Sequence, residues 1–148
     1  MEEIGLKNKQ NNLGLDMITD EENLVLKDNG NIYVDKRIME IFLSIGISAH
    51  LQGYQYLKEA IKLVMQEPEC INSVTKTMYP RIAEKCDTTA CRVERGIRHA
   101  LETSFAKGKM IKLNGILGLE VLSEGEKPTN SEFVALLADM LRLEFNKA

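Results

Sequence analysis

A cluster of arginine and glutamate side chains lies within a helix predicted over residues 89–107. Arg92 and Arg95 project from the polar face of this helix, and Glu94 lies on its flank. Arginine can hydrogen bond with both major-groove acceptors of guanine, and glutamate can accept a hydrogen bond from cytosine N4. A helix face that is exposed to solvent and has no binding role more often carries lysine and glutamate in i, i+4 pairs. These three residues are therefore candidates for reading DNA bases, with an ordinary solvated surface as the alternative.

Residues next to this cluster have the chemistry to bind the DNA backbone. Lys76 is a cation that can pair with a phosphate. Thr88 and Thr89 precede the helix, where hydroxyls and free backbone N–H groups form a natural phosphate site. Such contacts position a protein on DNA without specifying its sequence.

The distribution of charge supports a polyanionic partner. The net charge is −3, which by itself argues against nucleic acid. Residues 75–112, however, hold nine lysines and arginines against four acidic residues, whereas residues 1–40 hold five against nine. Binding to a polyanion depends on the local face and not on the total charge.

Two helices around a short turn must hold the cluster in place. Ala83 is small where two helices would cross, Cys86-Asp87-Thr88 forms the turn, and Val93 is an inward apolar anchor on the second helix. This spacing is typical of a helix-turn-helix, whose second helix enters the major groove. At about 100° per residue, one stripe of the second helix is apolar: Ala90, Val93, Ile97, Ala100 and Leu101.

The remaining periodicity predicts an all-α fold of about six helices. The first helix, from Lys36 onward, carries the apolar stripe Ile38, Ile41, Phe42 and Ile45. Further helices are predicted after Gly53, within 75–86, at 89–107 and 111–117, and after the linker 127–130. Residues 1–36 form a predicted flexible N-terminal extension, with a β-hairpin at 24–34 around Asn29-Gly30. Residues 37–148 form the predicted helical effector domain.

Enzyme, metal and membrane functions have little support. The two histidines, His50 and His99, have no evident nucleophile partner. Cys86, Cys91 and His99 are irregularly spaced and include no CxxC, which disfavours zinc. No apolar run approaches the ~20 residues of a membrane span, and the acidic N-terminus has no signal-peptide core. We therefore expect a cytoplasmic protein with reduced cysteines, no cofactor and no enzymatic activity.

Three blocks carry a close family resemblance: AHLQGYQYLKEAI at 49–61, TTACRVERGIRHALE at 88–102 and KPTNSEF at 127–133. They resemble the C-terminal effector domain of the master response regulator of sporulation initiation in endospore-forming bacteria, over roughly 38–145. The resemblance implies a six-helix domain with a helix-turn-helix that reads promoter boxes in double-stranded DNA. It also implies head-to-tail self-association on tandem sites and contact with an RNA polymerase sigma subunit. The family's base-reading positions map to Arg92, Glu94 and Arg95, and backbone contacts are expected at Arg98 and His99.

The chain departs from the family pattern in four respects. Residues 1–36 are too few for the family's phosphoacceptor receiver domain, Phe105 stands where tryptophan is usual, and Gly96 replaces alanine. Residues 108–126 match weakly. The main hypothesis is a sequence-specific transcription regulator, and the alternative is a receiver-less protein-interaction module that modulates a full-length regulator.

Overall fold

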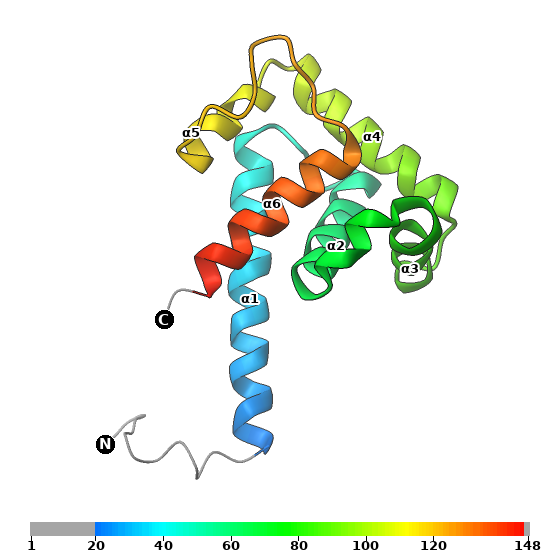
Figure 1. Cartoon of the computed structure of the whole chain (residues 1–148), viewed down its shortest axis with the longest axis vertical. Coiled ribbons are helices and arrows are strands. Elements are labelled where there is room, and N and C mark those ends of the chain that lie inside the picture. Colours follow the sequence, from blue (N-terminus) through cyan, green and yellow to red (C-terminus); the bar gives the residue numbers. More distant parts are fainter. Residues whose placement is uncertain (1–19, 147–148) are drawn as a thin grey trace. The chain divides into compact units, whose positions relative to one another are not determined.

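The computed structural model describes residues 20–146, with side chains from residue 30 onward, and every element in that part of the chain is helical (Figure 1). The elements are α1 (Asp20–Ser44), α2 (Gln52–Gln66), η2 (Pro68–Asn72), η3 (Val74–Met78), α3 (Tyr79–Lys85), α4 (Ala90–Ala106), η4 (Met110–Lys112), α5 (Leu113–Leu117) and α6 (Asn130–Phe145). The predicted all-α class with about six helices is confirmed.

The chain divides into two units, Met1–Val34 and Asp35–Ala148. In the first unit, residues 20–34 belong to α1, so the hairpin predicted at 24–34 is wrong. Asn29-Gly30 permits a tight turn without requiring one, and an isolated hairpin is marginally stable. A helix that is already nucleated gains one hydrogen bond for each residue it adds, which favours continuing α1. Residues 1–19 of the predicted flexible extension lie outside the described residues.

The core of the second unit is built around the C-terminal part of α1. The predicted stripe Ile38, Ile41, Phe42 and Ile45 is fully buried. The Phe42 ring meets Tyr54 of α2 edge-on, with ring centroids 5.2 Å apart, and lies 6.3 Å from the Phe133 ring of α6. The Phe42 ring therefore joins three helices through two aromatic contacts.

The helix α4 approaches α2 through a pair of glycines. A Cβ atom on Gly53 would lie 2.0 Å from the Gly96 carbonyl oxygen, and one on Gly96 would lie 2.8 Å from Cδ2 of Tyr56. Glycine within a helix costs about 1 kcal/mol relative to alanine. Gly96 is explained by this approach because the buried Tyr56 ring occupies the space of a methyl group.

Polar contacts fix the C-terminal end of α4 and the start of α6. The Ser104 hydroxyl donates to the Ile45 carbonyl, and Lys107 Nζ donates to the Gly46 carbonyl at 3.0 Å, so the end of α4 rests on the end of α1. A capping box begins α6: Thr129 Oγ1 accepts from the Glu132 amide, and Glu132 Oε1 accepts from the Thr129 amide.

Candidate nucleic-acid interface

A tight turn at residues 86–88 joins α3 to α4. Asp87 adopts φ 55°, the left-handed conformation that ends many helices. The Thr88 amide donates to the Ala83 carbonyl at 2.9 Å, and the Asp87 amide donates to the Glu84 carbonyl at 3.4 Å. This is the double hydrogen bond of a Schellman motif, formed with aspartate in the position that glycine usually holds. The turn therefore closes in three residues, as the sequence predicts.

The helix α4 begins at a side-chain cap and has two sharply different faces. Thr89 Oγ1 accepts a hydrogen bond from the Arg92 amide at 3.2 Å. The buried side of α4 consists of Val93, Ile97, Ala100, Leu101 and Ser104. The exposed side carries Arg92, Arg95, Arg98, His99 and Glu102. Arg95 is about 180° around the helix from the centre of the buried side, so it is the most outward of these residues.

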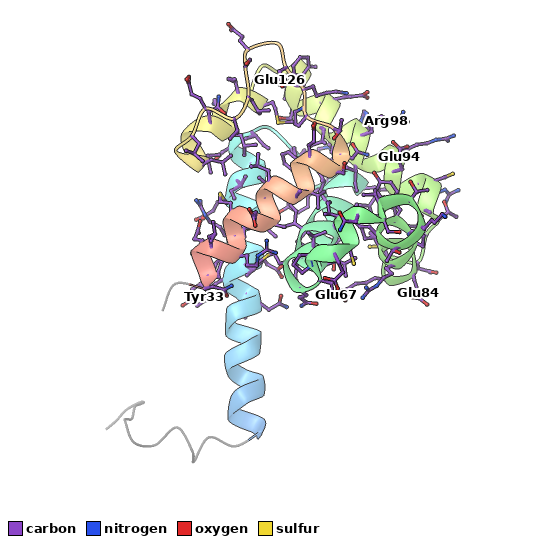
Figure 2. All side chains as sticks on the ribbon, viewed as in Figure 1. Tyr33, Glu67, Glu84, Glu94, Arg98 and Glu126 are labelled. Carbon is purple, nitrogen blue, oxygen red and sulfur yellow. The ribbon has the colours of Figure 1, made fainter. Side chains whose placement is uncertain are left out.

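Glu94 and Arg98 lie on the flank of α4 that faces the start of α6 (Figure 2). The Arg98 Nη2 atom is 3.6 Å from Glu94 Oε1, an i, i+4 ion pair. Asn130, the first residue of α6, donates from Nδ2 to the Glu94 carbonyl at 3.3 Å and to the Tyr79 hydroxyl at 3.1 Å. Burial raises the pKa of Tyr79 above its ordinary value. A single amide thus ties α3, α4 and α6 together beside Glu94.

Two ion pairs hold α3 against the elements that precede it. Lys85 Nζ is 2.9 Å from Oε1 of Glu59, which is buried on α2, and this hydrogen bond raises the pKa of Lys85. Arg81 binds both carboxylate oxygens of Glu67, at 2.8 and 2.7 Å. That hydrogen bonding holds the pKa of Glu67 below its ordinary value. The contacts orient α3, and through the turn they orient α4.

A family model described as "Sporulation initiation factor Spo0A C terminal" matches residues 38–141, more than two thirds of the 148-residue chain. The chain belongs to the Spo0A C-terminal family. The resemblance expected from the sequence is confirmed. The match begins at Ile38 and ends at Leu141, both fully buried, so it covers the packed core from α1 to α6. The Spo0A C-terminal family consists of DNA-binding effector domains of sporulation regulators and is not an enzyme family.

The residues that the sequence singles out fall into two places in this Spo0A C-terminal fold. Most of them share α4 or its N-terminal turn: Thr88, Thr89, Arg92, Glu94, Arg95, Arg98 and His99. Lys76 is exposed and belongs to η3, a separate element that packs against α3. The Thr89 hydroxyl serves the cap of α4, and Thr88 is half-buried in the turn. The arginines and Glu94 thus form one continuous surface.

Sequence reasoning missed Asn130 and Glu59, which position this surface. Asn130 lies in the recognisable KPTNSEF block, but its bonds to Tyr79 and Glu94 join residues far apart in the chain. Glu59 looks like an ordinary helix-surface carboxylate in sequence, and only the fold buries it against Lys85.

Among residues 30–146, no group of three or more His, Cys, Asp or Glu side chains is arranged to hold a metal ion. Cys70, Cys86 and Cys91 are free thiols. No helix within the described range combines the length and hydropathy needed to cross a membrane.

Proposed function

We propose that residues 37–148 act as a sequence-specific DNA-binding transcription regulator that reads promoter boxes through a helix-turn-helix. In this proposal α3 is the first helix, residues 86–88 form the turn, and α4 is the recognition helix. The observation that supports it is the polar face of α4, where Arg92 and Arg95 are exposed opposite a fully buried stripe and the half-buried Glu94 lies on the flank. The 17 residues of α4 form a helix about 26 Å long. A helix with its side chains is about 10–12 Å in diameter, which fits a major groove about 12 Å wide.

Each side chain has a role in the proposal. Arg95, the most outward residue, reaches the floor of the groove and hydrogen bonds with guanine, and Arg92 reads a neighbouring base pair. Glu94 accepts from a cytosine amino group. Arg98, His99, Thr88, Thr89 and Lys76 contact the backbone and fix the register of α4.

Self-association on tandem sites and contact with a sigma subunit complete the proposal, as the family resemblance implies. The end of α6 supports the first, because Leu143 is 68% exposed and gives one protomer an apolar contact for its neighbour. Exposed apolar side chains around η4 and α5, Ile111 and Leu119 among them, support a protein partner on a separate surface.

Selection of binding sites from a random duplex library tests the DNA-reading role. We expect the full chain to enrich one short box, and we expect an Arg95→Ala variant to enrich it less. If no sequence is enriched and no complex forms at low salt, the proposal is wrong. A protein-interaction module that modulates a full-length regulator then becomes the better account, and copurification with such a regulator would support it.

A further inference from the structure

A groove with charged residues in its walls lies between α4 and the start of α6, next to the proposed base-reading face. It has a volume of about 370 Å³, enough for a phosphate group and its hydrating water. The walls come from three parts of the fold: Tyr79 of α3, Glu94, Arg98 and Leu101 of α4, and the segment 127–131 that leads into α6.

Two cations from different elements line the groove. Arg98 belongs to α4 and Lys127 to the segment before α6. Each forms a long ion pair with a carboxylate: Arg98 Nη2 is 3.6 Å from Glu94 Oε1, and Lys127 Nζ is 3.5 Å from Glu102 Oε2. The Arg98 and Lys127 side chains are 50% and 35% exposed, and ion pairs this exposed are weak. Both cations can therefore exchange a long carboxylate contact for a charge-assisted hydrogen bond to a phosphate.

The position of the groove on the helix matches the path of a DNA strand. With Arg95 pointing into a major groove, Arg92 lies on one flank of α4, and Glu94 and Arg98 lie on the other. The two flanks of a helix in the major groove face the two phosphate backbones. The Arg98 flank is the one that α6 and Lys127 border.

We propose that this groove holds a backbone phosphate of DNA, bound between Arg98 and Lys127. The inference rests on the proposed function and adds Lys127, which the sequence did not single out. It also links the backbone to base reading. When the phosphate takes Arg98, the Glu94 carboxylate loses its partner and becomes free to accept from a base.

A salt titration of the full chain tests the groove. Affinities of wild type and Lys127→Gln are measured from 50 to 200 mM salt on the selected duplex and on a duplex of scrambled sequence. Loss of one phosphate contact makes the negative slope of log K against log salt shallower by about 0.9, where K is the association constant for DNA. The binding defect of Lys127→Gln is then about 3.5-fold larger at 50 mM than at 200 mM salt, and similar on both duplexes.

Two matched variants separate this contact from general charge and from folding. Lys36→Gln makes the same charge change at an exposed residue of α1 outside the groove, and it should keep the wild-type slope. Glu102→Gln frees Lys127 from its carboxylate, so it should tighten binding on both duplexes. Thermal melts confirm that each variant is folded.

The outcomes distinguish failure of the groove inference from failure of the proposed DNA-binding function. If wild type binds its selected box and folded Lys127→Gln keeps the wild-type slope, the groove holds no phosphate and the proposed function stands. If Lys36→Gln lowers the slope as much as Lys127→Gln, the effect is general charge and the groove inference is also overturned. If wild type binds no DNA, the proposed function fails and the groove inference fails with it.

Discussion

Replacing Gly53 with alanine tests how closely α2 and α4 approach. The new Cβ atom would lie 2.0 Å from the Gly96 carbonyl oxygen and 2.9 Å from Ala100 Cβ, where ordinary contact begins at 3.4 Å. The main obstacle is a backbone oxygen inside a helix, so no side-chain rotation can relieve it. The two helices must separate, and α4 carries the proposed DNA-reading face with it.

The expected size of the effect follows from two opposing terms. Overpacking a well-packed site costs about 1–3 kcal/mol and occasionally more. Alanine in place of glycine within a helix recovers about 1 kcal/mol. Because the clash is with backbone at 2.0 Å, the overpacking term is at the upper end of its range. We expect Gly53→Ala to lower the free energy of unfolding by about 2 kcal/mol.

Urea denaturation followed by far-UV circular dichroism measures this change. Gly115→Ala is the matched control, because Gly115 lies in α5 and a Cβ there meets nothing within 4 Å. That variant should be as stable as wild type or slightly more so. A Gly53→Ala protein as stable as the control would refute the close crossing of α2 and α4.

Three further predictions concern DNA reading, acid stability and the N-terminal unit. Arg95→Ala should weaken binding to the selected box by about 1–3 kcal/mol and relax preference at one base pair in competition titrations, and an equal loss on scrambled DNA would reduce Arg95 to a phosphate contact. The folded pKa of Glu67 is depressed by Arg81, so the stability that this pair provides is present above the unfolded carboxylate pKa and lost as pH falls through the lower folded value. Melting temperatures between pH 6 and 3 should therefore fall less for Glu67→Gln than for wild type, and parallel pH profiles would contradict this role. Deleting residues 1–34, which form a separate unit, should leave the main thermal transition within a few degrees of wild type, and loss of cooperative melting would show that the second unit depends on the first.

Elements with a strong period were predictable from sequence. The stripe Ile38, Ile41, Phe42 and Ile45 is buried as expected, because a 3.6-residue period leaves a helix only one face for the core. The same reasoning divided α4 correctly into a buried side and a charged side. The turn at Asp87 was also predictable in place, although its left-handed conformation was not.

Features that depend on tertiary contacts were not predictable. Asn29-Gly30 is a strong local turn signal, yet these residues continue α1, because local propensity does not decide between a lone hairpin and an extended helix. In the sequence, Gly96 indicates only a destabilised helix. In the structure, the Tyr56 ring occupies the space that a side chain on residue 96 would need. The groove beside Lys127 brings the segment 127–131 against α3 and α4 residues at least 26 positions earlier in the chain, so no local pattern could indicate it.

A structure of the full chain bound to its selected duplex tests the central claim most directly. The account predicts α4 in the major groove, with polar atoms of Arg92, Glu94 and Arg95 within about 3.2 Å of base edges. It also predicts Lys127 and Arg98 on a single phosphate along the α6 side of α4. A complex in which α4 lies outside the major groove, or in which these three side chains touch only phosphates, would contradict it.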